Sequence, residues 1–332
     1  EEYILKSALV VLNGVPGANG WIFTWTYGNR NAAIDNMVNA QNFGITLRAK
    51  MFSYFGRNAN TCFDSSPDFF QKPSTIICTG EKFTYNHSAY DNELDSLSYS
   101  WAEPLDGNFC TNRPCLLGGL FQENNFPAMV PFDVADGYAF DKPFPDTTFD
   151  SRNEQAVLNH ETGEITFTSF NSGEFVSVIR VSAYKCGIKV AEVYRELQTV
   201  ITSGCASNEP PIIPSPLANG TFSDTVKAGE FIEFDIRVFD TLRLDNPKDD
   251  SIFFYASGLQ FGTNFTDSLT GCLNPPCATL SRPAPDTGFG VFTTKFRWQT
   301  TCNHLVNSTP SCITSQNSYL FVIRAFDDFC PA

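Results

Sequence analysis

The sequence predicts an all-β protein made of tandem immunoglobulin-like or cadherin-like β-sandwich domains joined by Pro-rich linkers. Three observations lead to this class: the chain repeats part of itself, its composition suits pleated strands, and no long amphipathic helical pattern occurs. Phe is the dominant aromatic residue, at 32 of 332 positions, beside abundant Thr, Val, Ile, Gly and Pro. Such residues favour half-buried strands joined by tight turns.

The repeat consists of four features that occur twice in the same order. Residues 80–91, GEKFTYNHSAYD, align without a gap on residues 229–240, GEFIEFDIRVFD. In both copies an Asp-Ser-aliphatic step follows, at residues 95–97 and 250–252. A six-residue cysteine loop comes next, at residues 110–115 and 272–277. Each copy ends with a strand that contains Val-Ile-Arg, at residues 178–180 and 322–324. Duplication is typical of proteins that space or present a surface, whereas an enzyme usually needs one cleft.

We expect three domains, since 332 residues exceed one ordinary core. Residues 1–64 would be an N-terminal β domain or a partial repeat, residues 65–206 a β-sandwich repeat and residues 207–332 a second β-sandwich repeat. Residues 210–216 hold four prolines, which favours an extended, stiff spacer at the second boundary. The clearest strands are expected at residues 82–86, 96–101, 165–170, 175–184, 190–202, 231–239, 251–256, 290–299 and 318–326, with a hairpin at 184–191.

Eleven cysteines indicate an oxidising compartment. Short Pro- and Asn-containing loops favour two local disulfides, Cys110 with Cys115 and Cys272 with Cys277. The alternative is zinc, but its cysteine pairs usually lie two to four residues apart with further ligands nearby. The pairing of the other seven cysteines stays open, and an odd total leaves one thiol free or paired outside this sequence.

The net charge of −14 argues against nucleic acid as a partner, because an acidic surface repels phosphates. No apolar run of 18 residues predicts a membrane span, and no signal peptide is recognisable. The chain begins almost directly in a strand-like run, which indicates a processed or truncated start.

The acidic turns after the repeated strands are the candidate metal sites. Asp91, Glu93 and Asp95 alternate along one turn, and Asp240 and Asp250 lie in the equivalent region of the second copy. Convergent oxygen ligands are what calcium requires, so we expect calcium as the one candidate cofactor. The alternative is a solvated turn in which Asp serves its turn propensity.

No catalytic residue is expected. His87, His160 and His304 lie in unrelated contexts, and none of the common hydrolase, phosphate-loop or dinucleotide motifs occurs. The four tryptophans lie in strand-like runs, where burial in a sandwich core is the expected role.

Three long stretches carry a resemblance to a known family: residues 20–37 (GWIFTWTYGNRNAAIDNM), residues 60–107 from NTCFDSSP to EPLDG, and residues 192–211 (EVYRELQTVITSGCASNEPP). Together they resemble a recurring module of very large Bacteroidota cell-surface proteins, among them the SprB-like gliding-motility adhesins. Two departures are a missing cysteine pair before Asn29-Arg30 and the absence of the usual Gly from the acidic turn.

The resemblance implies export by the type IX secretion system, an extracellular location on the bacterial cell surface, and a part in attachment or gliding without enzymatic activity. The implied partners are neighbouring repeats of the same long chain, the surface motility or secretion machinery, and a polysaccharide or abiotic surface. An extracellular carbohydrate-binding or polysaccharide-active protein is the alternative, and binding to a defined glycan would favour it. A virion-type structural protein is a third reading, which the cysteine loops disfavour because they would stay unpaired in a reducing cytosol.

Overall fold

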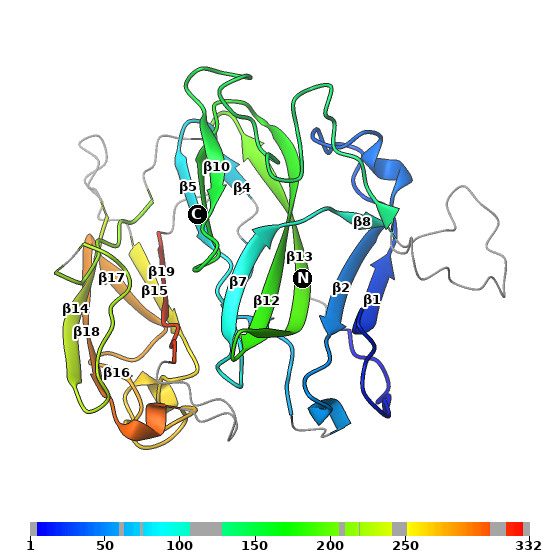
Figure 1. Ribbon diagram of the computed structural model, residues 1–332. Coiled ribbons are helices and arrows are strands. Elements are labelled where there is room, and N and C mark those ends of the chain that lie inside the picture. The colour runs from blue at the N-terminus through cyan, green and yellow to red at the C-terminus, as the bar shows by residue number, and fades with distance from the viewer. Residues whose placement is uncertain are drawn as a thin grey trace.

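A computed structural model describes residues 5–59, 63–73, 76–106, 128–205, 210–218, 220–240, 251–305 and 317–327. Within these ranges the chain forms β-strands and four short 3-10 helices, and no α-helix (Figure 1). The all-β prediction is therefore confirmed, and the strands assemble into two sandwiches, each with its own core. No helix in the described part of the chain is long and apolar enough to cross a membrane.

The first sandwich is built around one large sheet. Its strand order is β7-β12-β13-β2-β8-β9, with β1 added to β2 and β4 added in parallel to β13. The strands are β1 (Trp21–Tyr27), β2 (Ile45–Met51), β4 (Ile76–Cys78), β7 (Ser96–Trp101), β8 (Leu105–Asp106), β9 (Ala128–Met129), β12 (Gly173–Lys185) and β13 (Ile188–Thr202). The 3-10 helices η1 (Ala40–Asn42) and η2 (Arg57–Ala59) flank β2.

A smaller sheet covers part of the large one. It has the order β10-β11-β5, from Glu154–Leu158, Glu164–Thr168 and Lys82–Asn86, and β3 (Asp68–Phe69) pairs separately with β6 (Ala89–Tyr90). Aromatic rings fill the space between the layers: the Phe144 ring lies 4.1 Å from that of Phe167 on β11 and 6.2 Å from that of Phe175 on β12. Burial of such rings supplies most of the stabilisation of a sandwich.

The hairpin expected at residues 184–191 is present between β12 and β13. Cys186 and Gly187 form its turn with positive φ angles of 54° and 76°. The two strands pair from Gly173 with Ile201 as far as Lys185 with Ile188, with one register shift after Ala183. β12 and β13 are the longest strands of the first sandwich, and both lie in the interior of its large sheet.

Residues 21–51 join the same sheet. Met51 pairs with Ala191 and Ala49 with Val193, so β2 lies beside β13. The Arg30 guanidinium donates through Nε and Nη2 to the two carboxylate oxygens of Glu196 on β13, at 3.0 and 2.7 Å. Three residues of this segment also belong to the core of the first sandwich: Ile34, Met37 and Ala40. Sheet and core therefore continue across residue 64, where the sequence suggests a domain boundary.

The second sandwich has the strand order β14-β18-β17-β15-β19, with β16 on β18. Its strands are β14 (Phe231–Phe239), β15 (Ser251–Ser257), β16 (Thr279–Leu280), β17 (Asp286–Phe289), β18 (Val291–Gln299) and β19 (Val322–Phe326), with helices η3 (Thr263–Phe265) and η4 (Cys302–His304). β17 meets β18 only at a tight turn, where Phe289 pairs with Val291. The sheet thus folds into two layers, and the Phe254 and Phe292 rings stack across the core at 4.5 Å.

The duplication is visible in the strand pairing. β5 pairs antiparallel with β11, and its counterpart β14 pairs antiparallel with β18. β7 pairs with β12, and β15 pairs with β19. The arginine of Val-Ile-Arg faces the fifth residue of the partner strand both times: Arg180 pairs with Ser100, and Arg324 with Tyr255. Both copies therefore share these two pairings, and the second of them has the same register.

The turn that leads into the aligned strands is also repeated. Gly80 and Gly229 have positive φ angles of 81° and 103°, a region that favours glycine. In each turn the next residue donates its backbone N–H to the carbonyl oxygen three positions earlier, from Glu81 to Cys78 and from Glu230 to Lys227. The two glutamates differ in exposure, since Glu81 is half-buried and Glu230 is exposed, and the Glu230 carboxylate accepts the backbone N–H of Lys227 at 3.1 Å.

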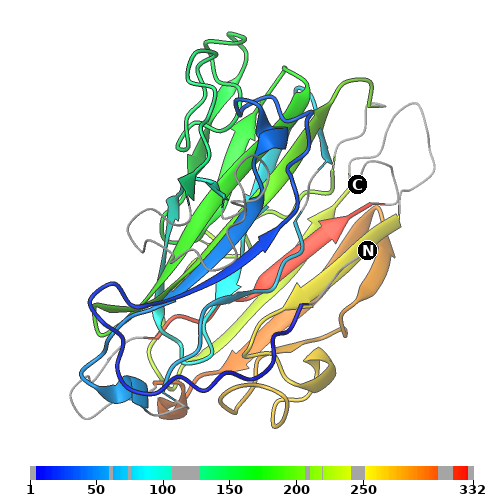
Figure 2. The same ribbon diagram turned by 90° about the vertical axis from the view of Figure 1, so that its right-hand side faces the viewer.

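The Pro-rich segment does not act as a free spacer. Ile212 exchanges two backbone hydrogen bonds with Phe239, at 2.7 and 2.9 Å, so the segment runs along the edge of β14. Ile213 packs on the second core. The two sandwiches lie side by side rather than end to end, with β19 on the side of the second that faces the first (Figures 1 and 2).

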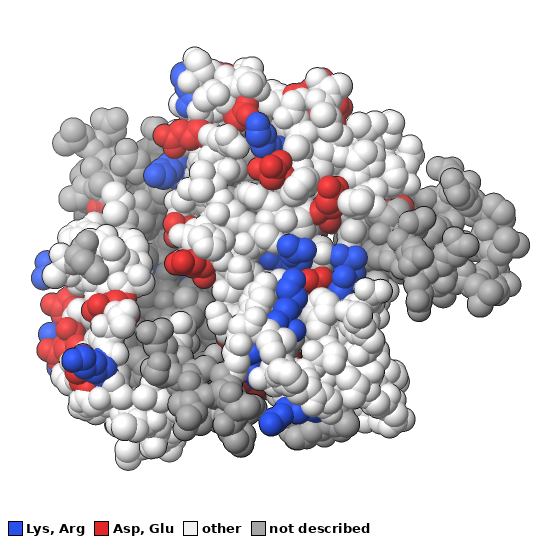
Figure 3. All heavy atoms as spheres, in the orientation of Figure 1, with Lys and Arg blue, Asp and Glu red and all other residues white. Residues whose placement is uncertain are grey.

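Charged side chains are spread thinly over the face seen in Figure 3. Most of that face is uncharged, and a line of Lys and Arg side chains lies over β13 and β2. Two basic side chains of β2 are paired with β13: Lys50 Nζ lies 3.4 Å from a carboxylate oxygen of Glu192, and the Arg48 guanidinium lies over the Tyr194 ring at 4.4 Å. This side of the sheet is therefore a network of paired groups rather than an open basic surface.

Candidate functional site

The acidic turn proposed for calcium is organised around its own backbone. The Asp91 Oδ1 oxygen accepts hydrogen bonds from the backbone N–H groups of Glu93 and Asp95, at 2.9 and 3.1 Å. The Glu93 carboxylate points instead to Ser65, whose N–H and hydroxyl both donate to Oε2, at 3.0 and 2.7 Å. The three candidate ligands thus do not converge on one point.

A lysine supplies the positive charge at this turn. Lys185, at the end of β12, places Nζ 2.8 Å from Asp95 Oδ1 and 3.6 Å from Asp64 Oδ1. All three side chains are buried, with 3%, 4% and 2% of their surfaces exposed for Lys185, Asp95 and Asp64. We call Lys185, Asp64, Asp91 and Asp95 the buried acid–lysine cluster. It differs from the expected calcium site because an ammonium group occupies its centre.

The other half of the calcium expectation falls partly outside the described residues. Asp240 follows β14 and is half-buried, whereas Asp250 lies in a stretch that the structure does not describe. Across the described ranges, no group of three or more His, Cys, Asp or Glu side chains is arranged so that it could hold a metal ion.

Burial changes the acidity of the buried acid–lysine cluster. It raises the pKa of Asp64 to about 8, and the neighbouring Asp95 charge adds to the rise. Burial also raises the pKa of Asp91 to about 6. Burial lowers the pKa of Lys185, but its hydrogen bond with Asp95 and the surrounding carboxylates outweigh that effect, so the Lys185 pKa is raised. The lysine therefore stays charged while the carboxyl groups compete for protons.

Asp64 is expected to make the first sandwich lose stability as pH rises. Its pKa is higher in the folded state than in the unfolded state, so folding takes up a proton between about pH 4 and pH 8. The Asp64 contribution is complete below about pH 4 and is lost as pH approaches 8. Asp64→Asn should flatten this dependence in denaturant unfolding at pH 5, 6, 7 and 8. Equal slopes for the variant and the wild type would contradict the assignment.

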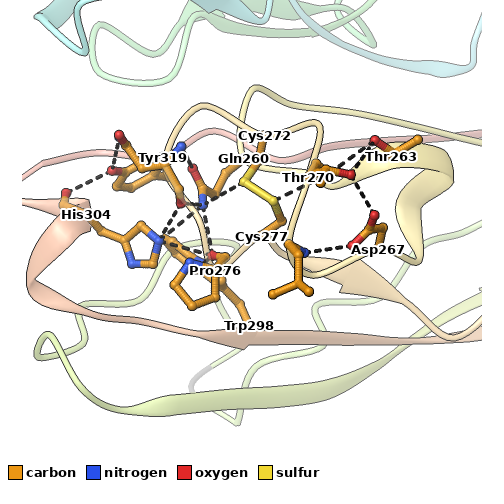
Figure 4. Close-up of a disulfide and its surroundings, with 12 residues drawn as sticks. Gln260, Thr263, Asp267, Thr270, Cys272, Pro276, Cys277, Trp298, His304 and Tyr319 are labelled. Carbon is orange, nitrogen blue, oxygen red and sulfur yellow. Dashed lines mark hydrogen bonds between the residues drawn. A yellow bond between two sulfur atoms is a disulfide. The ribbon is translucent and has the colours of Figure 1, made fainter.

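The cysteine loop of the second copy is closed as predicted, by a disulfide between Cys272 and Cys277 (Figure 4). Side chains of the second sandwich contact the backbone carbonyl oxygens of this loop. The Trp298 indole N–H donates to the Pro276 carbonyl oxygen at 3.0 Å, and the His304 Nε2 atom lies 2.7 Å from the Asn274 carbonyl oxygen. The Gln260 amide nitrogen contacts the Pro276 carbonyl oxygen at 3.1 Å.

The tautomer of His304 follows from these contacts. Its Nδ1 atom accepts the backbone N–H of Thr301 at 2.9 Å, so Nε2 carries the proton that faces the loop carbonyl groups. The Tyr319 hydroxyl donates to the His304 carbonyl oxygen at 2.8 Å. The His304 side chain thus stabilises the cysteine loop by hydrogen bonding to its carbonyl oxygens.

The other two histidines lie in different settings. His87 is buried at the end of β5, where burial and then the Arg195 charge lower its pKa to about 3, so it is neutral. His160 is exposed beside Glu161, at 3.8 Å. Within the described part of the chain the three histidines form no common site, and no nucleophile, base and orienting group come together around any of them.

A second disulfide joins distant parts of the first sandwich. Cys78, at the end of β4, is bonded to Cys205, just beyond the end of β13. Sequence reasoning left this pairing open, although the parallel pairing of β4 with β13 brings the two ends together. Cys186 is also disulfide-bonded, and Cys302 is free and exposed. The predicted pair Cys110 and Cys115 lies outside the described residues.

Trp298 and Trp25 differ in how far they are buried. Trp298 is buried in the second core, as expected. Trp25 on β1 is not: 38% of its surface is exposed, and its ring lies parallel to that of Tyr27. The alternation of β1 signals a strand but not how much of it is covered, since that depends on the width of the opposing sheet.

Comparisons with known proteins assign no family. No family model and no curated protein matches the chain. Among solved structures, the chain is similar to an I-band fragment of titin, with 8% sequence identity and a TM-score of 0.18; the alignment covers 96% of this chain and 93% of that chain. A likeness of this size supports no inference about function, so function has to be argued from the duplicated sandwiches and their surfaces.

Proposed function

We propose that this chain is a structural and adhesive segment of a large secreted bacterial cell-surface adhesin that acts in surface attachment or gliding motility. The observation that carries the proposal is the duplicated sandwich, in which β7–β12 and β15–β19 are equivalent strand pairs with the same register. Repeated units of this kind build long surfaces from one fold.

Two further features support an extracellular setting. The disulfides Cys78–Cys205 and Cys272–Cys277 form in oxidising compartments and are rare in the cytosol. The net charge of −14 favours solubility and disfavours binding to nucleic acid. In this proposal the chain leaves the cell through the type IX secretion system, its partners are neighbouring repeats and the surface motility machinery, and it catalyses no reaction.

Surface labelling and a deletion strain test the proposal together. Antibodies against the purified chain are expected to label intact cells of the source bacterium, and deletion of the parent gene should reduce attachment to glass and colony spreading. A strain that lacks an unrelated surface protein serves as the control. Labelling only after lysis, or normal attachment and spreading without the gene, would overturn the proposal.

A further inference from the structure

Strand β1 carries a row of aromatic side chains on one face. Trp21, Phe23, Trp25 and Tyr27 alternate along the strand, and alternate residues of a strand point to the same side. The Trp25 and Tyr27 rings lie parallel, with an interplanar angle of 7° and 5.8 Å between centroids. Tyr27 is 67% exposed, and Phe23 is also exposed. We call these four residues the aromatic strip.

Trp21 is half-buried, and the other three residues of the aromatic strip are exposed because the large sheet extends beyond the small one. Phe23 pairs with Ala49 and Ala49 with Val193, so these residues share one face of the sheet. Further along this face, the guanidinium of Arg195 on β13 lies over the Phe69 ring at 4.5 Å and near Tyr85 of the small sheet. β1 lies at the opposite end of the sandwich from β5, where that cover has ended (Figure 1).

A groove adjoins the aromatic strip. It has a volume of about 250 Å³ and an apolar floor from three neighbouring strands, formed by Phe23, Ala49, Met51 and Ala191. Lys50 and Asp64 also line it, and each is paired with an opposite charge, Lys50 with Glu192 and Asp64 with Lys185. Ser65 and Ser66 line its wall, and Ser66 is exposed. The two hydrogen bonds from Ser65 to Glu93 fix this wall in position. The groove thus places hydroxyl groups beside an apolar floor that continues into the aromatic strip.

We propose that the aromatic strip and the groove bind an uncharged polysaccharide. Sugar rings present flat C–H faces that stack on aromatic rings, while their hydroxyl groups pair with side chains such as serine. The row is linear and about 20 Å long from Trp21 to Tyr27, which suits an extended oligosaccharide rather than a single sugar. β1 carries no charged residue, and the negative net charge of the chain disfavours acidic polymers.

This inference names a ligand class for the proposed adhesive surface and so rests on the proposed function. The competing occupant is a second copy of the chain. Among the described strands β1 pairs only with β2, and the edge of a sheet is a template for pairing with another chain. The exposed parallel rings and the serine wall favour the polysaccharide, because an added strand would use the backbone of β1 and would need neither.

Affinity electrophoresis and calorimetry of the purified 332-residue chain test the proposal. The probes are hydroxyethyl cellulose, xylan and laminarin as uncharged polymers, and alginate as an acidic one. Binding to at least one uncharged polymer and none to alginate is expected. The double variant Trp25→Ala/Tyr27→Ala should weaken that binding at least tenfold, and Ser66→Trp, which fills the groove, should also weaken it. The matched control is Phe289→Ala, because Phe289 is likewise 67% exposed but lies in the second sandwich.

Thermal unfolding shows whether each variant is folded, and light scattering shows whether the chain forms a dimer. The strip variants should unfold in one cooperative transition and stay folded at the temperature of the binding measurement, since Trp25 and Tyr27 lie at the surface of the sheet. No binding to any uncharged polymer, or equal binding by all variants, would overturn the proposal. A concentration-dependent dimer that the double variant abolishes would assign the face to a second copy and overturn it as well. Each of these results is separate from the cell-labelling test, so the adhesin proposal can stand if this one fails.

Discussion

Replacing Cys78 and Cys205 together by serine is expected to lower the free energy of unfolding of the first sandwich by about 4–5 kcal/mol. The disulfide closes a loop between residues 127 positions apart, and a long closed loop removes much conformational entropy from the unfolded chain. The loss should appear as a lower denaturant midpoint for amide exchange in β12 and β13, while β14 and β18 keep theirs.

The short disulfide of the second sandwich provides the matched control. Cys272 and Cys277 are only five positions apart, so the same entropy argument gives roughly 2 kcal/mol for their replacement by serine. An effect of the Cys78/Cys205 change no larger than that of the Cys272/Cys277 change would show that loop closure does not govern the stability of the first sandwich.

Replacing Lys185 by methionine is expected to destabilise the first sandwich by about 3–5 kcal/mol at pH 8, because the buried carboxylates of Asp64 and Asp95 lose the cation beside them. At pH 5 the cost should be much smaller. Asp64 and Asp91 have pKa values raised to about 8 and about 6, so both are mostly protonated there and need less neutralisation. Denaturant unfolding at the two pH values measures the difference.

Lys189→Met is the control for this change. Lys189 lies on the same hairpin and pairs with Glu192 at 3.3 Å, but its side chain is much more exposed, so its loss should cost under about 1 kcal/mol. A combined Lys185→Met/Asp95→Asn variant should recover part of the lost stability at pH 8. Equal effects of the two lysine changes would show that Lys185 does not neutralise the cluster.

Local sequence patterns predicted the strands well. Lys82–Asn86, Ser96–Trp101 and Phe231–Phe239 have the expected bounds, and β12, β13, β15 and β18 differ from expectation by one or two residues at an end. Lys82–Asn86 and Ser96–Trp101 alternate and end at turn residues, which is where period-two patterns are informative, whereas β12 is buried on both faces over most of its length. The duplication was likewise readable, because both copies carry the same landmarks in the same order.

The pairing of distant segments was not predictable in the same way. Nothing in residues 45–51 signals that β2 will lie beside β13, since a strand pattern does not name its partner. Lys185 resembles any lysine near a hairpin turn, and only the fold brings Asp64 and Asp95 around it. The calcium expectation considered the carboxylates of one turn without the cation that a neighbouring strand supplies.

The bond between Cys78 and Cys205 has a mechanical consequence for a protein that is anchored at one end and pulled at the other. Tension that reaches residue 78 can pass directly to residue 205 through the sulfur atoms, so residues 79–204 carry no load. Fully extended, residues 79–204 would span about 420 Å, and the disulfide prevents this segment from being extended. In a pulling experiment, reduction of the disulfide should add this length to the extension of the unfolded chain. The disulfide therefore limits how far the chain can lengthen under force.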